Sequence, residues 1–200
     1  MKKYLFFFTA VLMVLTLPGC LKNDPVPTPE PLEIFPLSTG NQWHFRTTES
    51  NQQITFHINE VAGDTLVNGQ QWFILTYDTT IKTTCRNTLA GWWFLYQPSP
   101  GAPVTQELYY RYPALVGERY MTGDSTLITV TAIYEAITVP AGTFFCYHYH
   151  MVHYLENYEC EEYFSPGVGF IKHVVYEPGT GSMRIASVTE LMEYHLSGTR

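Results

Sequence analysis

Residues 143–154 read T-F-F-C-Y-H-Y-H-M-V-H-Y, and residues 159–165 follow as E-C-E-E-Y-F-S. Both stretches are rich in aromatic and β-branched residues and show no helical period of 3.6 residues. Successive side chains of a strand point to opposite faces, so alternate residues share a face. The more apolar face, expected to join the core, carries Phe145, Tyr147, Tyr149 and Met151. The two stretches together predict an antiparallel hairpin.

The rest of the chain from residue 35 onward continues this pattern of short apolar stretches. Ten strands are expected, at residues 43–48, 53–61, 71–80, 91–97, 106–112, 127–134, 143–154, 159–165, 170–176 and 183–194. The breaks between them carry turn residues, at 63–64, 68–69, 98–103, 123–124, 140–142 and 178–181. Short strands with frequent Gly, Pro, Asn and Asp turns predict an all-β fold. We expect a single antiparallel β-sandwich, or an open or closed barrel, of about ten strands.

A weak internal repeat divides this region into two related halves, residues 35–111 and 112–196. Phe35-Pro36, Gly40 and Trp43 match Tyr112-Pro113, Gly117 and Tyr120 at an offset of 77 residues, and Gly91-Trp92-Trp93 matches Gly169-Phe170-Ile171 at an offset of 78. The period is too long for a solenoid repeat. The alternative is independent use of Pro and Gly at strand starts.

The densest group of potential metal ligands lies in the same hairpin. Cys146, His148 and His150 share one strand face, whereas His153 falls on the other. A His-x-His pair suits Zn²⁺ or Cu²⁺ when a partner strand adds a carboxylate. The candidate carboxylates are Glu159, Glu161 and Glu162. The competing interpretation, which we favour, is a solvated acidic hairpin whose two histidine rings point apart, so we expect no metal and no cofactor.

The cysteines bear on the cellular compartment. An exported, oxidising compartment permits one disulfide among Cys85, Cys146 and Cys160. Cys146 and Cys160 are 14 residues apart across the predicted hairpin, so this pair is the first choice. A bridge from Cys85 to either of them, or no bridge, remains open.

The first twenty residues form an export signal. Lys2 and Lys3 precede an apolar run over residues 4–15, which is too short to span a membrane. The Gly19-Cys20 pair after it resembles the lipobox of bacterial lipoproteins. The resemblance implies cleavage after residue 19, a diacylglycerol thioether on Cys20 and acylation of the new amino terminus, for example with palmitate. Alternating prolines predict an extended tether, so we expect a signal peptide (1–19), a lipidated tether (20–34) and one all-β domain (35–196).

The charge of the chain excludes some partners. Removing residues 1–19 leaves 181 of the 200 residues and takes the net charge from −7 to −9, because the signal holds two lysines and no acid. Nucleic-acid binding rests on basic clusters that neutralise phosphates, so we expect none. Attachment to the membrane is expected through the lipid on Cys20. Abundant aromatic residues fit either a β core or a platform for a glycan.

A second resemblance covers most of residues 35–194. Phe35-Pro36-Leu37 with Gly40 and Trp43, the segment 139–144 and the segment 166–169 resemble a group of exported Bacteroidota lipoproteins of unknown function. These are turn and core residues, so the resemblance implies a fold and no catalytic residue.

The sequence therefore predicts a lipid-anchored protein of the cell envelope, located in the outer membrane. Whether its domain faces the cell surface or the periplasm is left open. Its expected role is binding a ligand or a protein partner. The alternatives are a structural or assembly subunit of an envelope complex and, more remotely, a metal-dependent hydrolase. No nucleophile elbow or His-Glu-x-x-His motif occurs, so we do not expect an enzyme.

Overall fold

The computed structural model describes residues 33–78, 80–97 and 102–197. The chain divides into two units, Met1–Pro31 and Leu32–Arg200, and the first lies outside the described residues. The predictions for the signal peptide, Cys20 and the tether up to residue 32 therefore concern residues that the structure does not describe. No helix able to cross a membrane is found among the described residues.

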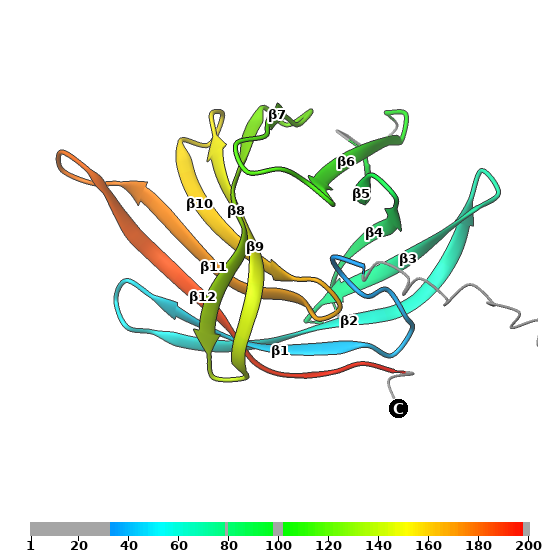
Figure 1. Cartoon of the computed structure of the whole chain (residues 1–200), viewed down its shortest axis with the longest axis horizontal. Helices are drawn as coiled ribbons and strands as arrows, with labels where there is room; N and C mark the ends of the chain where they lie inside the picture. The colour runs from blue at the N-terminus through cyan, green and yellow to red at the C-terminus, as the bar shows by residue number, and fades with distance from the viewer. Residues whose placement is uncertain (1–32, 79, 98–101, 198–200) are drawn as a thin grey trace, which may run out of the picture. The chain divides into compact units, whose positions relative to one another are not determined.

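The described part of the chain forms twelve strands and no helix (Figure 1). They are β1 (Gln42–Glu49), β2 (Ile54–Val67), β3 (Gln70–Tyr77), β4 (Ile81–Thr88), β5 (Gly91–Tyr96), β6 (Thr105–Arg111), β7 (Arg119–Met121), β8 (Thr126–Val139), β9 (Gly142–His153), β10 (Tyr158–Ser165), β11 (Gly169–Pro178) and β12 (Met183–His195). All belong to one antiparallel sheet in the order β6-β5-β4-β3-β2-β1-β12-β11-β10-β9-β8-β7. The prediction of an all-β antiparallel fold is confirmed, in the form of an open sheet.

Three of the expectations are wrong for identifiable reasons. The turn predicted at Gly63-Asp64 lies inside β2, where a β-bulge between Val61 and Gly63 absorbs the glycine. Strand β4 was missed because its sequence is mostly polar and only Cys85 is buried. The predicted core position Phe145 is 49% exposed and stacks on Tyr134, because the alternation within β9 breaks: Cys146 and Tyr149, three residues apart, are both buried.

The sheet curls so that its inner face encloses an aromatic core. Trp92 of β5 contacts Phe164 of β10 with ring centroids 5.9 Å apart, and Tyr110 of β6 contacts the same ring at 4.7 Å. Phe35, which precedes β1, stacks on Trp92 at 4.4 Å. These strands are distant in the order of the sheet, so the rings can meet only because the two ends of the sheet approach each other. Large buried aromatic side chains of this kind dominate the energetics of a core.

Side chains join the two ends of the sheet, strands β6 and β7. The Tyr120 hydroxyl of β7 donates a hydrogen bond to the carbonyl of Tyr109 at 2.9 Å and accepts one from the backbone N–H of Arg111 at 3.2 Å. The Tyr149 hydroxyl donates to the carbonyl of Arg111 at 2.8 Å. Phenolic hydroxyls therefore satisfy backbone groups of β6 that have no strand partner.

The two matching segments of the predicted repeat form equivalent corners. The N–H of Gly40 donates to the carbonyl of Val61 at 2.9 Å, and the N–H of Gly117 donates to that of Val130 at 2.8 Å. Both glycines have a φ of +89°, a conformation that residues with a Cβ rarely adopt. One corner leads into β1 and the other into β7, so each opens a run of six consecutive strands. Superposition of the two halves stays a prediction.

Candidate functional site

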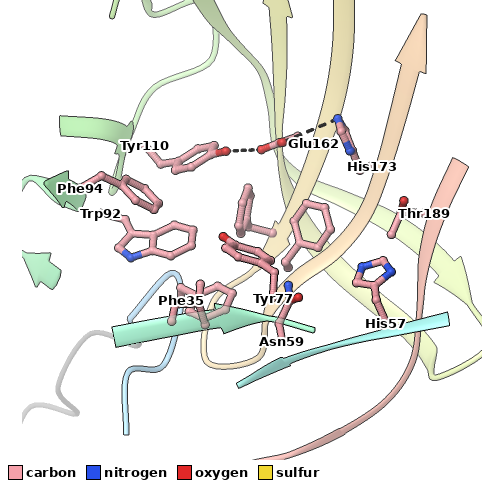
Figure 2. Close-up of a pocket in the computed structure, with 13 residues that line it drawn as sticks. Phe35, His57, Asn59, Tyr77, Trp92, Phe94, Tyr110, Glu162, His173 and Thr189 are labelled. Carbon is pink, nitrogen blue, oxygen red and sulfur yellow. Dashed lines mark hydrogen bonds and ion pairs between the residues drawn. The ribbon is translucent and has the colours of Figure 1, made fainter. Parts of the chain in front are cut away.

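A cavity of about 230 Å³ lies against the inner face of the curled sheet (Figure 2). Its lining is mostly aromatic, with a few polar side chains. The lining residues are Phe35, His57, Asn59, Leu75, Tyr77, Trp92, Phe94, Tyr110, Glu162, Phe164, Phe170, His173 and Thr189. They come from seven strands and from the segment before β1. Residues so distant in sequence line one cavity only because the sheet curls.

Strand alternation decides which acidic residues reach the cavity. Along β10, Cys160 and Phe164 are 2% and 1% exposed and point inward, so Glu162 between them also faces the interior. Glu159 and Glu161 point outward. His173 of β11 is the direct cross-strand partner of Glu162 in the antiparallel register, and it therefore enters the same face.

The carboxylate of Glu162 is held by two neighbours (Figure 2). Its Oε2 accepts a hydrogen bond from the Tyr110 hydroxyl. Its Oε1 lies 3.8 Å from Nε2 of His173. Burial and the negative charge of Glu162 raise the pKa of Tyr110 well above its ordinary value, so the phenol keeps its proton and donates. The wall of the cavity thus presents an anionic group whose orientation is fixed.

Three polar atoms of the lining residues lack hydrogen bonds among the described residues. They are Oδ1 of Asn59, Nε1 of Trp92 and Nε2 of His173, all of which are buried. Buried polar atoms almost always have a partner in native proteins, so a water molecule, an ion or a ligand group is expected beside each. His57 adds a neutral imidazole, because burial lowers its pKa despite the nearby charge of Asp78.

A sulfur atom and a second imidazole lie next to the Glu162 carboxylate. A ligand atom each from Cys160, Glu162 and His173 lie within 4.8 Å of one another. Sγ of Cys160 is also 3.5 Å from Nε2 of His153, whose Nδ1 lies 2.9 Å from the Thr126 hydroxyl. Thiol, carboxylate and imidazole are all transition-metal ligands, so this cluster is the part of the site that could hold a metal ion.

The residues that the sequence singled out for a metal have other partners. Nδ1 of His148 is 2.9 Å from Glu135, and Nε2 of His150 is 2.9 Å from Glu159. Glu161 lies 3.9 Å from Nε2 of His148 and accepts hydrogen bonds from the hydroxyls of Tyr163 and Tyr176. His148 and His150 therefore contact different carboxylates, and with Glu161 they form no three-ligand group among the described residues.

Cys146 and Cys160 do not form the expected disulfide. Cys85, Cys146 and Cys160 are free and buried. The register pairs Cys160 with Met151 and Cys146 with Glu135, on opposite sides of β9. Cys146 and Met151 are five residues apart on β9, which corresponds to roughly 17 Å, whereas the Cα atoms of a disulfide lie within about 7 Å. Burial raises the pKa of all three thiols, that of Cys85 and Cys146 to about 12, so each keeps its proton near neutral pH.

Sequence reasoning reached part of this site. It named Cys160 and Glu162, and it placed His153 on the face opposite His148. It missed His173 and Tyr110. The spacing of Cys160 and Glu162, two residues apart on one strand, could have indicated a shared inward face. His173 could be added only once the register between β10 and β11 was known.

The fold and the site together define an all-β protein with an aromatic inner cavity, and known structures share this fold. An exported protein with a YmcC-like fold from Bacteroides fragilis matches with a TM-score of 0.51 and 14% identity, covering 82% of this chain and 100% of that one. A structure described as a lipoprotein from Parabacteroides distasonis matches with a TM-score of 0.50 and 16% identity, covering 83% and 100%. No protein-family model matches the chain, and no curated protein sequence is similar to it. At these identities the likeness shows the fold alone.

Proposed function

We propose that this protein is a lipid-anchored protein of the cell envelope whose curled sheet binds a small aromatic molecule. The observation that carries the proposal is the cavity of about 230 Å³, which combines aromatic walls with a fixed carboxylate and unpartnered polar atoms. Small-molecule sites are typically apolar cavities with a few polar groups that fix the orientation of the ligand. The cavity is smaller than the usual range of about 300–1,000 Å³, so it fits a molecule of one ring.

The charge of the site selects among such molecules. Glu162 presents a carboxylate, and Oδ1 of Asn59 is an acceptor without a hydrogen bond among the described residues. A ligand that carries an amine or another hydrogen-bond donor would satisfy both, whereas a carboxylate would meet repulsion. Rings such as those of Trp92 and Phe94 also attract cations through their faces. The preferred ligand is therefore an aromatic amine, followed by a neutral aromatic alcohol.

Three probes of equal size test this preference in the purified full-length protein. Phenethylamine is cationic, 2-phenylethanol is neutral and phenylacetate is anionic at neutral pH. Trp92 lines the cavity, so its fluorescence reports binding, and Trp92→Phe should remove the signal. We expect saturable binding of the amine at millimolar concentration or below and no binding of the acid.

Two matched variants on strand β10 identify the group responsible. Glu162→Gln keeps an acceptor for the Tyr110 hydroxyl but removes the charge, so the amine should lose its advantage over the alcohol. Glu159→Gln changes an outward carboxylate that contacts His150 and should leave all three affinities unchanged. The proposal fails if no probe gives a saturable signal, or if both variants behave alike.

The membrane anchor is proposed from the Gly19-Cys20 pair and is supported by a structural neighbour described as a lipoprotein. We expect Cys20→Ser to move the protein from the membrane fraction to the soluble fraction, because the acyl chains supply the hydrophobic anchor. Sedimentation of the Cys20→Ser protein with membranes would contradict this. The proposed location is the outer membrane, and protease accessibility in intact cells distinguishes a surface-facing domain from a periplasmic one.

One surface feature favours a second candidate, an assembly subunit with a protein partner. Ile54, Phe56 and Ile58 alternate along β2 and are 52%, 69% and 41% exposed. Apolar stripes of this kind mark protein contacts when they are continuous. A photo-crosslinking amino acid at position 56 in intact cells would trap such a partner. A crosslink that persists when Ile54 and Ile58 are replaced by serine would argue against the stripe.

A further inference from the structure

Three potential metal ligands from the neighbouring strands β10 and β11 converge beside the cavity, and a fourth, His153 of β9, lies next to one of them. His153 ends β9, Cys160 and Glu162 lie on β10, and His173 lies on β11. Sulfur, carboxylate oxygen and imidazole nitrogen of Cys160, Glu162 and His173 lie within 4.8 Å of one another, and Nε2 of His153 is 3.5 Å from the sulfur. We propose that these residues form a transition-metal site, with Zn²⁺ as the expected ion.

Two distances between ligand atoms are close to those around a tetrahedral zinc ion, whereas His153 lies outside the group whose ligand atoms are all within 4.8 Å of one another. A Zn–S bond of about 2.3 Å and a Zn–N bond of about 2.05 Å at the tetrahedral angle place sulfur and nitrogen roughly 3.5 Å apart. The observed separation between Cys160 and His153 is 3.5 Å. Oxygen and nitrogen ligands should lie about 3.3 Å apart, and Glu162 and His173 are separated by 3.8 Å. Shifts of a few tenths of an ångström would close this pair around an ion.

Groups behind two of the ligands orient them as metal sites require. The Thr126 hydroxyl lies 2.9 Å from Nδ1 of His153, so a proton on Nδ1 can be donated to Thr126 and Nε2 keeps its lone pair for a metal. The Tyr110 hydroxyl donates to Oε2 of Glu162 and leaves Oε1 facing His173. Hydrogen bonds from neighbouring groups to the metal-binding residues fix ring tautomers and carboxylate orientation in known metal centres.

The local chemistry selects the class of ion. Nε2 of His173 is buried without a hydrogen bond, and the adjacent carboxylate carries a negative charge in a partly buried setting. A divalent cation would satisfy both. Thiolate with imidazole favours Zn²⁺ over Mg²⁺ or Ca²⁺, which prefer oxygen ligands. On binding, the Cys160 thiol releases its proton to solvent and the sulfur forms the bond to the metal, so one proton leaves for each ion bound.

This inference shares Glu162 with the proposed aromatic ligand, but it can be tested separately. Glu162 and His173 also line the cavity, but Cys160 and His153 do not. Variants at Cys160 therefore test the metal without removing the charge that the aromatic amine is proposed to recognise. Loss of metal binding with retained amine binding, or the reverse, separates the two proposals.

The test is a titration of the full-length protein, after treatment with a chelator, with Zn²⁺ and with Co²⁺ as a spectroscopic substitute. We expect one equivalent of Zn²⁺ to bind and the Co²⁺ protein to show a near-ultraviolet thiolate charge-transfer band. Cys160→Ser should abolish that band, and His173→Gln should weaken Zn²⁺ binding by at least about tenfold. Cys146→Ser and His148→Gln change a buried thiol and an outward imidazole outside the cluster and should bind like the wild type.

Circular dichroism and melting temperature establish that each variant is folded. The wild-type measurement decides the question even if a variant does not fold. Absence of stoichiometric Zn²⁺ binding, or of a thiolate band in the wild-type Co²⁺ protein, overturns the proposal. A charge-transfer band that survives in folded Cys160→Ser also overturns it. Loss of Zn²⁺ binding in His148→Gln does so too, because it would place the ion at His148 and His150.

Discussion

Replacement of Tyr120 by phenylalanine tests how the two ends of the sheet are held together. The substitution keeps the ring, which packs under the Arg111 guanidinium at 4.3 Å, and removes only the hydroxyl. That hydroxyl donates to the carbonyl of Tyr109 and accepts from the N–H of Arg111. Each net hydrogen bond contributes about 0.5–1.5 kcal/mol, so the loss of both should lower the free energy of unfolding by about 2 kcal/mol.

The assay is thermal and urea unfolding followed by circular dichroism. For a domain of this size, about 2 kcal/mol corresponds to a fall in melting temperature of about 4–8 °C. Burial raises the pKa of Tyr120 to about 12, so the effect should not depend on pH between 7 and 9, which lies below the pKa of about 10 of tyrosine in the unfolded chain. Amide hydrogen exchange at Arg111 should also become faster, because its N–H loses its acceptor.

Tyr134→Phe is the matched control, since that side chain is 73% exposed and its loss of a hydroxyl should change stability by less than about 0.5 kcal/mol. If Tyr120→Phe costs no more than Tyr134→Phe, or if exchange at Arg111 is unchanged, the hydroxyl does not hold the ends of the sheet together and the reasoning is refuted.

Two further predictions concern stability. Gly91→Ala should abolish soluble expression or lower the free energy of unfolding by more than about 3 kcal/mol, because its Cβ would lie 2.0 Å from the carbonyl oxygen of Tyr110 at a φ of +130°. Gly63→Ala, which meets nothing within 4 Å, should melt like the wild type, and a comparable loss in both variants would contradict the steric argument. Burial holds the pKa of His57 below 6.5, so the folded state binds fewer protons than the unfolded state and stability should fall as the pH drops below about 6.5. Urea unfolding between pH 5 and 7.5 should show a smaller decrease for His57→Gln, and an equal decrease would exclude His57 as a contributor.

The strands were largely predictable because their pattern is local. Alternation placed Tyr149 and Met151 in the core, where they are 0% and 1% exposed. The prediction for position 145 failed because the alternation breaks within β9, between Cys146 and Tyr149, and no local pattern in residues 143–154 encodes this break. The sequence pattern did not predict strand β4, because its stability comes from its neighbours β3 and β5 on both sides rather than from its own apolar residues.

The site was less predictable because it depends on the register between strands. Cys160 and Glu162 share a strand, and their common face follows from their spacing. His173 joins them only through the pairing of β10 with β11, and Tyr110 only through the curl that brings β6 across to β10. His148 and His150 were selected because they are closely spaced in the sequence, but each contacts a different carboxylate.

The pairing of β1 with β12 has a consequence for how the chain folds. Arg46 and Glu190 meet across this pair at 2.8 Å although they are 144 residues apart in the chain. The edges of the sheet are made of hairpins between consecutive strands, whereas its centre joins the first strand to the last. Closing so long a loop is entropically costly, and folding slows as contacts become more distant in sequence. The centre of the sheet therefore cannot assemble before the last strand is available, and until then the six-stranded piece β1–β6 exposes the unpaired edge of β1 to aggregation.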